Sequence, residues 1–212
     1  MIEFLLGTDI NFARWDHLTS LQLAASNGEI ETVRLLLEKG VNFNKADGFN
    51  GSALQIASDG GHTEVVCLLL EKGMDINTVG GKQELSPLQA AAAKGHQEVV
   101  LLLLGNSADI NAAGKCGTAL TLASRNGHTE MVRLLIEKGA NVNAVGKEGS
   151  ALRAASAQGH ENIVHILLNN GADVNAVGEY GSALKAAVKK RHKRIAQLLR
   201  KNGVKEEGVK SM

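Results

Sequence analysis

The stretch SALRAASAQGHENIVHILLNNGADVN, residues 150–175, shows in full a pattern that recurs six times along this chain of 212 residues. In most copies a Ser or Thr and a small residue precede an anchor leucine, and a Gly-His pair, an apolar run, a second Gly and an Asp/Asn-apolar-Asn triplet follow. The anchors, spaced 33, 34, 32, 32 and 32 residues apart, are Leu21, Leu54, Leu88, Leu120, Leu152 and Leu184. Self-similarity at this period predicts a solenoid of stacked units rather than one globular core.

One unit, residues 52–77, predicts two helices joined by a tight turn. Ser52 is placed to cap a first helix of small residues, and Gly61 ends that helix because glycine tolerates a positive φ. A second helix should begin near Thr63 and close at Gly73. It is apolar nearly all round, so we expect neighbouring units to bury it on both sides.

Hairpin-like loops should join one unit to the next, since Asn and Gly follow each triplet. The distance from the triplet Asn to the next anchor leucine varies along the chain. It is 10 residues for Asn44–Leu54, 11 for Asn77–Leu88, and 9 for Asn111–Leu120, Asn143–Leu152 and Asn175–Leu184. The longest hairpin tip is therefore expected at Gly80–Leu85.

These blocks resemble the ankyrin repeat, whose pattern is G-x-T-P-L-H-x-A-A-x-x-G-H-x-x-[IV]-V-x-x-L-L-x-x-G-A-D-[VI]-N. The most similar stretches are residues 118–143 and 150–175, and the resemblance covers about residues 2–203. The Thr-Pro of the family survives only as Ser86-Pro87. The variant Gly-Ser-Ala-Leu-Gln at 51–55 looks like ankyrin arrays of fungal NACHT-type signalling ATPases. The resemblance implies an all-α ankyrin-repeat solenoid of stacked helix-turn-helix units with hairpin loops.

The same alignment predicts the domain organisation. Residues 1–18 would form a partial repeat or an N-terminal cap, residues 19–203 the ankyrin repeat domain, and residues 204–212 a flexible tail. The repeats would be 19–47, 48–81, 82–114, 115–146, 147–178 and 179–203, the last as a C-terminal cap. Residues 2–11 resemble the end of a second helix and its triplet, so we expect the chain to start inside a repeat, either as a fragment of a longer array or as a domain with a minimal cap.

Composition narrows the class of protein. No apolar run reaches the roughly 20 residues of a membrane span, and MIEFLLGTDIN lacks the basic region of a secretory signal. Cys67 and Cys116 lie in different repeats and form no metal-binding or disulfide framework. We therefore expect a cytoplasmic, reducing location, with the nucleus as an alternative.

Charge is divided unevenly although the net charge is only +1. Residues 1–112 hold 7 Lys/Arg and 14 Asp/Glu, a net of −7, and residues 113–212 hold 16 and 8, a net of +8. Such a split affects the orientation of partners and their association rate rather than the fold.

Histidine and asparagine columns are best explained by the scaffold. One His per repeat would stack about 10 Å from the next, too far apart for shared coordination at about 2 Å; these residues should satisfy backbone groups of the turns. Each triplet Asn should bond the backbone of its own turn. We therefore predict no catalytic residue, no metal site and no cofactor. The histidines are His62, His96, His128, His160 and His192, and the asparagines are Asn44, Asn77, Asn111, Asn143 and Asn175.

Candidate partner-binding residues are those that do not repeat. In ankyrin-like proteins the hairpin tips and the exposed side of the first helix line a concave groove, and the resemblance transfers this role to the matching positions. At the tips these are Phe49, Asn50, Lys82, Gln83, Glu84, Lys115, Lys147, Glu148 and Tyr180. On the first helices they are Asp59, Lys94, Arg125, Asn126, Arg153, Gln158, Lys185, Lys189 and Lys190.

Two features of this set have two interpretations each. The aromatic rings of Phe49 and Tyr180 either anchor a partner or pack on their own loops. The basic cluster around Lys185, Lys189 and Lys190 is either a solvated cap or a docking patch for an acidic partner or an anionic surface.

The leading hypothesis is a non-enzymatic, monomeric scaffold that binds a protein partner in this groove. The alternatives are a structural spacer or regulatory module of a larger signalling protein, and binding to nucleic acid or an anionic surface through the basic C-terminal end. Nucleic acid is disfavoured because the basic residues lack interleaved aromatics for stacking. An enzyme is disfavoured because the repeat explains every candidate catalytic residue.

Overall fold

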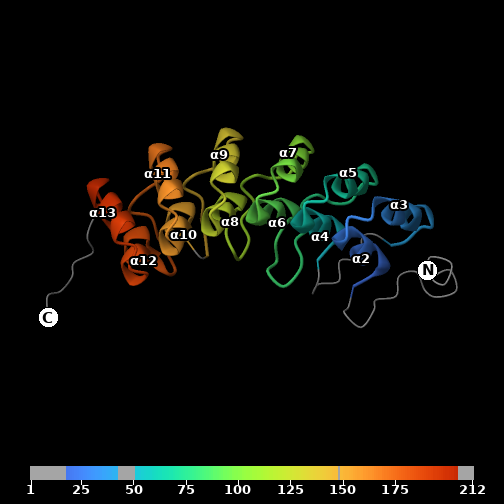
Figure 1. Ribbon diagram of the computed structural model, residues 1–212, viewed down its shortest axis with the longest axis horizontal. Helices are drawn as coiled ribbons and strands as arrows, with labels where there is room; N and C mark the ends of the chain where they lie inside the picture. The colour runs from blue at the N-terminus through green and yellow to red at the C-terminus, as the bar shows by residue number, and fades with distance from the viewer. Residues whose placement is uncertain (1–17, 43–50, 148, 205–212) are drawn as a thin grey trace. The chain divides into compact units, whose positions relative to one another are not determined.

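Paired α-helices make up the computed structural model, which describes residues 18–42, 51–147 and 149–204 (Figure 1). The chain divides into two compact units, Met1–Asp109 and Ile110–Met212. In both units a short first helix is followed after a tight turn by a second helix, as the sequence predicts. Phe49, Asn50 and Glu148, three of the candidate residues, lie outside the described residues.

Unit 1 contains three helix pairs in its described part. The first helices, α2, α4 and α6, pack on one another in order, and each also packs on the second helix that follows it. The pairs are α2 (Ser20–Ser26) with α3 (Ile30–Glu38), α4 (Ala53–Gly60) with α5 (Thr63–Glu71), and α6 (Pro87–Lys94) with α7 (Gln97–Gly105).

Unit 2 repeats this arrangement and adds two short hairpins. Here α10 packs between α8 and α12, and each of these first helices again packs on its own second helix. The pairs are α8 (Ala119–Asn126) with α9 (Thr129–Glu137), α10 (Ala151–Gln158) with α11 (Glu161–Asn169), and α12 (Ala183–Lys189) with α13 (Lys193–Lys201). The hairpin strands are β1 (Val145–Gly146), β2 (Gly149–Ser150), β3 (Val177–Gly178) and β4 (Gly181–Ser182).

Each first helix begins at a hydroxyl cap. Ser52 accepts from the backbone N–H of Gln55 at 3.1 Å, which confirms its predicted role. Ser86 makes a full capping box, since Gln89 also accepts from the backbone N–H of Ser86 at 2.8 Å. Hydroxyl capping therefore persists in the repeats that lack the family's proline. The other caps are Thr19, Thr118, Ser150 and Ser182.

Left-handed residues end the helices, as the glycine positions predict. Gly61 caps α4 with a φ of 74°, and Gly73 follows α5 with a φ of 81°. Two other residues replace glycine at equivalent turns: Ser107 after α7 has a φ of 68°, and Arg191 after α12 has a φ of 64°. These two turns are strained, because a Cβ disfavours the left-handed region.

Burial is greatest on the first helices and weaker on the second helices. Successive second helices make fewer contacts with one another than successive first helices do. Within α5, Val66 and Leu69 are fully buried but Cys67 and Leu70 are only half-buried. In α7, 43% of Leu101 is exposed. The second helix α5 contacts the second helices α3 and α7 on its two sides, as predicted, but its outer side faces solvent, so its burial is incomplete.

Hairpin tips differ in length as predicted from the spacing. Gly80 pairs with Leu85 across residues 81–84, whereas Gly114 pairs with Gly117 across residues 115–116. In unit 2, Gly146 pairs with Gly149 and Gly178 with Gly181, which leaves residues 147–148 and 179–180 at the tips. The tip of residues 81–84 is thus the longest one that the structure describes.

Histidines join neighbouring repeats within each unit. Nε2 of His62 donates to the carbonyl oxygen of Ser26 at 3.0 Å, and Nε2 of His160 donates to that of Arg125 at 2.9 Å. His96 and His192 make equivalent bonds to Asp59 and Ala157. For these four histidines the prediction that they satisfy backbone groups is confirmed, and the acceptor in each case lies at the end of the preceding first helix.

Asparagines of the triplets also link repeats, which corrects the prediction of purely local bonds. The side-chain oxygen of Asn77 accepts from the N–H of Asp109 at 3.3 Å, and that of Asn111 accepts from the N–H of Asn141 at 2.8 Å. Asn143 bonds the next repeat twice, accepting from the N–H of Asp173 and donating to the carbonyl of Gly171. The local turn bond comes instead from the first residue of the triplet.

Candidate functional site

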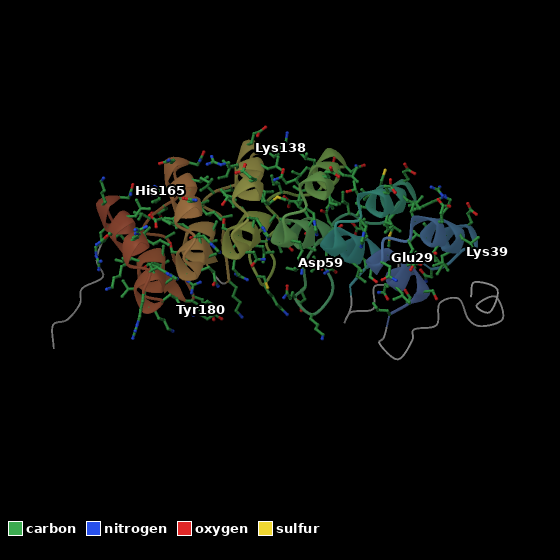
Figure 2. The ribbon with its side chains drawn as sticks, viewed as in Figure 1. Glu29, Lys39, Asp59, Lys138, His165 and Tyr180 are labelled. Carbon is green, nitrogen blue, oxygen red and sulfur yellow. The ribbon has the colours of Figure 1, made fainter. Side chains whose placement is uncertain are left out.

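The candidate residues within the described ranges lie at hairpin tips and on first helices, as the resemblance implies. Most of them are exposed, while Arg125 and Arg153 are half-buried. Figure 2 labels one of them on each unit, Asp59 on α4 and Tyr180 at the tip between β3 and β4. The exposed members are Asp59, Lys82, Gln83, Glu84, Lys94, Lys115, Asn126, Lys147, Gln158, Tyr180, Lys185, Lys189 and Lys190.

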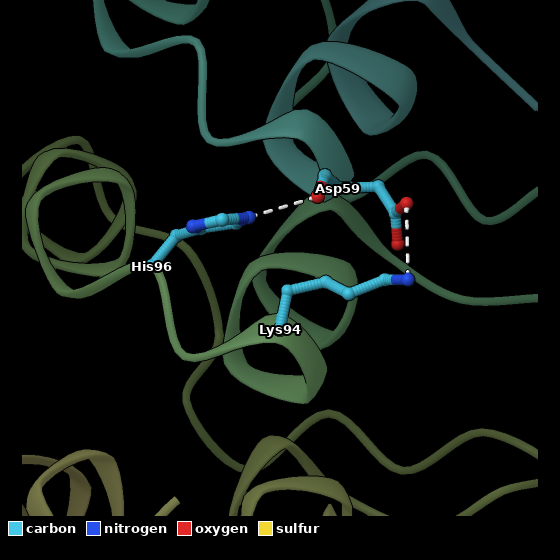
Figure 3. A network of polar contacts seen from close by, with 3 residues as sticks. All are labelled: Asp59, Lys94 and His96. Atoms are coloured by element: carbon cyan, nitrogen blue, oxygen red, sulfur yellow. Dashed lines mark hydrogen bonds and ion pairs between the residues drawn. The ribbon is translucent and has the colours of Figure 1, made fainter.

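In unit 1 the structure brings two candidates together as an ion pair. Nζ of Lys94 at the end of α6 lies 3.7 Å from a carboxylate oxygen of Asp59 on α4. Figure 3 shows that the same Asp59 uses its backbone carbonyl to accept from Nε2 of His96, at 2.9 Å. Both side chains of the ion pair are about half exposed, so its contribution to stability is small. The pair leaves the first helices of unit 1 without net charge at these positions.

Residues 82–84 form the exposed part of the long tip in unit 1. Lys82, Gln83 and Glu84 all have exposed side chains. The amide of Glu84 donates to the carbonyl of Gly81 at 3.0 Å, and Glu84 has a φ of 50°. The tip is thus a closed turn that presents three polar side chains to solvent.

In unit 2, Arg153 holds the tip that carries Tyr180. The guanidinium carbon lies 5.3 Å from the centre of the Tyr180 ring, and Nη2 donates to the backbone carbonyl of Tyr180 at 3.4 Å. Tyr180 as a whole remains 55% exposed. An Arg guanidinium over a Tyr ring attracts it. This contact restricts the motion of the ring and leaves much of its surface exposed. An exposed aromatic ring held in one orientation is well suited to anchor a partner.

Arg125 makes a similar contact with a different tip. Its Nη2 donates to the carbonyl of Cys116 at 3.2 Å, which connects α8 to residues 115–116. The two arginines therefore have a positioning role at hairpin tips in addition to their charge. Sequence reasoning selected both residues but gave no indication of these contacts.

Hairpin glycines leave room for the side chain that follows the anchor leucine. A Cβ on Gly149 would lie 2.6 Å from Cδ of Arg153, and a Cβ on Gly181 would lie 2.8 Å from Cδ of Lys185. In each case the long side chain occupies the space in which the Cβ of any residue other than glycine would lie. The residue directly after the anchor leucine is therefore displayed beside the hairpin.

Charge on the first helices differs between the units. None of the residues of α8, α10 and α12 is acidic, whereas these helices carry Arg125, Arg153, Lys185 and Lys189. Second helices α9 and α11 instead carry Glu130, Glu137 and Glu161 with Arg133. The positive charge of unit 2 is thus concentrated on the first helices and on the terminal helix α13.

Groups with chemical reactivity are few in the described part of the chain. Burial raises the pKa of the Cys67 thiol, and a hydrogen bond to Glu71 and the charge of that carboxylate raise it further. A raised pKa lowers the thiolate fraction and hence the nucleophilicity of Cys67. Among the described residues, no three His, Cys, Asp or Glu side chains gather as metal ligands would.

Three exposed valines on the hairpins were missed by the sequence reasoning. Val79, Val145 and Val177 occupy the same repeat position and are 55%, 51% and 56% exposed. Their signal was visible in the sequence as the recurring valine before the hairpin glycine. A recurring apolar residue is typical of a buried scaffold position, so the pattern itself did not indicate exposure.

Comparison with known families agrees with this geometry. A family model whose description is Ankyrin repeats (3 copies) matches the chain over residues 1–80, 44–113, 88–178 and 145–208. The chain therefore belongs to the ankyrin-repeat family, whose members are generally protein–protein interaction modules and typically not enzymes. A search of curated proteins found no match. No helix in the described ranges combines the length and the apolarity that a bilayer crossing requires.

Proposed function

We propose that this chain is a non-enzymatic protein-binding scaffold, which holds a partner on the surface formed by its hairpin tips and first helices. One observation carries the proposal. The repeated polar residues are used by bonds between repeats, while the residues that do not repeat point outward from tips and first helices.

Contacts of the repeated residues support this division. His96 and His160 each donate to a carbonyl of the preceding first helix, and Asn111 and Asn143 each accept from the next repeat. Side chains fixed in this way serve the stack. Function in a repeat protein resides in the surface that the stack displays.

Properties of the displayed surface favour protein as the ligand. Tyr180 supplies an aromatic ring positioned by Arg153, and Tyr and Arg are the residue types enriched at the centres of protein interfaces. Polar tips such as residues 82–84 supply the adaptable hydrogen bonds of an interface rim. Nothing in this arrangement requires a cofactor, so binding would depend on the chain alone.

A quantitative pull-down tests the proposal. The full chain would be used as bait in lysate of the cells that produce it, beside a variant in which Lys82, Gln158 and Tyr180 are all replaced by Ser. A matched control would replace Arg133, Glu137 and His165, which are exposed on the second helices. We expect partner recovery to fall about tenfold in the first variant, since hot-spot residues dominate binding, and to stay unchanged in the control.

Two outcomes would contradict the proposal. Equal loss with both variants would show that the partner does not use the tips and first helices. Failure of the chain to enrich any protein, including when it is embedded in its full-length parent, would favour the spacer function instead.

A further inference from the structure

The first helices of unit 2 present basic side chains on one common face. Arg153 and Lys185 directly follow an anchor leucine, while Arg125 and Lys189 lie five residues after one. Positions one and five are four residues apart, so they share a face of the helix. Because α8, α10 and α12 pack in order, these four residues form a single basic face across three helices.

Placement of this charge is selective within the unit. Second helices α9 and α11 carry more acidic than basic residues, so the basic face does not reflect a uniformly basic surface. In unit 1 the same position of α4 holds Asp59, which Lys94 neutralises at 3.7 Å. Among the first helices, the basic face is therefore confined to α8, α10 and α12, while the terminal second helix α13 is basic as well.

We infer that this basic face binds an extended acidic segment of a partner protein, an assignment that rests on the proposed scaffold function. Opposite charge steers such a segment to the face and suppresses neutral or basic competitors. Tyr180, held beside Arg153, offers an aromatic contact within the same surface. Glu179 is exposed beside Tyr180 at the same tip. Its negative charge repels further carboxylates of the partner, so the acidic segment should end there.

Geometry also sets the spacing of the carboxylates. Packed helices lie about 9 Å apart, and an extended polyproline-II chain advances about 3.1 Å per residue with three residues per turn, so every third side chain points the same way. A segment that runs across α8, α10 and α12 thus advances about three residues per helix. The matching partner segment carries Asp or Glu at every third position.

Nucleic acid fits this face less well. A nucleic acid strand carries one phosphate per roughly 3.4 Å, a denser charge than one or two cations for every helix step of about 9 Å. Single strands also need successive aromatic side chains for stacking. Tyr180 is the only aromatic residue among residues 110–212 of the sequence.

Fluorescence anisotropy with the full chain tests this inference. The probe is a labelled peptide of about nine residues, which spans the three helices when extended, with Glu at every third position among Ser and Ala. Two further peptides carry the same Glu residues in one block, or Gln in their place. We expect the spaced peptide to bind about tenfold more tightly than the Gln peptide and more tightly than the block peptide.

Charge-matched variants locate the binding face. The triple substitution Arg125→Gln, Lys185→Gln and Lys189→Gln should weaken binding of the spaced peptide about tenfold. Lys193→Gln, Arg194→Gln and Lys201→Gln removes the same charge from exposed positions of α13 and should weaken binding less than about threefold. Circular dichroism checks that each variant is folded. If the first variant fails to fold, Lys185→Gln with Lys189→Gln replaces it, against Lys193→Gln with Arg194→Gln.

Several results would overturn the inference. Equal weakening by both variants would show unspecific attraction, and equal binding of the spaced and block peptides would remove the predicted register. Tighter binding of a single-stranded oligonucleotide, lost with the same first-helix variant, would identify nucleic acid as the ligand. A protein partner from the pull-down whose binding ignores the first-helix variant would leave the scaffold function standing and refute the acidic segment alone.

Discussion

At the scale of single residues, the informative positions are those where this chain departs from its own repeat. Ser107 and Arg191 adopt the left-handed conformation that glycine adopts in the equivalent turns. Cys67 stands at a position of the second helix where most other repeats have a polar residue such as Arg133 or His165, and it contacts Glu71 at 3.6 Å. Each departure changes a measurable local property without changing the fold.

Replacing Ser107 by Gly should stabilise the protein. The left-handed region costs a residue with a Cβ about 1–2 kcal/mol, and the greater chain entropy of glycine removes about half of that gain. We expect the free energy of unfolding to rise by about 0.5–1 kcal/mol, measured by urea denaturation. Ser107→Ala is the control and should bring no gain. An equal gain with Ala would show that backbone strain at Ser107 is not the cause.

Alkylation of Cys67 should be slow at neutral pH. Its raised pKa keeps the thiol protonated at neutral pH. The rate of its reaction with iodoacetamide should therefore continue to rise beyond the pH at which the rate for an unperturbed thiol becomes constant. In a Cys116→Ser background, Glu71→Gln should shift this profile to lower pH, because it removes the negative charge beside the sulfur. Mass spectrometry of the modified peptide over time gives the rate. An unchanged profile in Glu71→Gln would leave burial as the sole cause.

At the scale of elements, side-chain bonds to the neighbouring repeat hold the helix pairs in place. The ring of His160 lies at the start of α11 and donates to the carbonyl of Arg125 in α8. A Cβ on Gly127 would lie 2.7 Å from the same ring. The histidine of the following repeat thus packs closely against the turn after α8.

Removing this histidine should loosen the connection between two repeats. His160→Ala loses the hydrogen bond to Arg125 and the packing against Gly127, so we expect a loss of about 1–2 kcal/mol of stability. His165→Ala on the same helix is the matched control, because His165 is exposed (Figure 2). Its effect should stay within about 0.5 kcal/mol. Equal effects of the two substitutions in thermal denaturation would contradict a linking role for His160.

Sequence reasoning predicted local structure well at this scale and contacts between repeats less well. The cap at Ser52, the helix end at Gly61 and the long tip after Gly80 follow from turn and cap chemistry within one unit. The partner of Asn143 was mispredicted, because its side chain bonds residues 171 and 173 of the next repeat. The contact between Arg153 and Tyr180 joins two repeats in the same way. Such pairings depend on how far one repeat is shifted relative to the next. The sequence of a single repeat does not determine this shift.

At the scale of the whole molecule, the two units have opposite charge. Unit 1 has a net of −7 and unit 2 a net of +8, since the boundary between residues 109 and 110 leaves the counts for residues 1–112 and 113–212 unchanged. Each unit buries its own row of first helices and has its own buried leucines. Stability in such arrays is a sum of local terms, so each unit can open without global unfolding.

Core substitutions should therefore act mainly within their own unit. Leu135 in α9 and Leu103 in α7 are fully buried at equivalent repeat positions. Leu135→Ala should cost about 2–5 kcal/mol and speed hydrogen exchange most in α8–α11. Leu103→Ala is the reciprocal control and should speed exchange most in α4–α7. Uniform acceleration over both units in either variant would show a single cooperative fold.

The passage left by Gly149 and Gly181 has a consequence for how new specificity arises. Of the two side chains that extend past a hairpin there, Lys185 is exposed, so its identity does not affect the core, whereas Arg153 also holds the tip of Tyr180. A library randomised at position 185 should yield clones that keep the melting temperature of the parent and differ in the ligands they select. The hairpin glycines thus make this surface evolvable at constant stability.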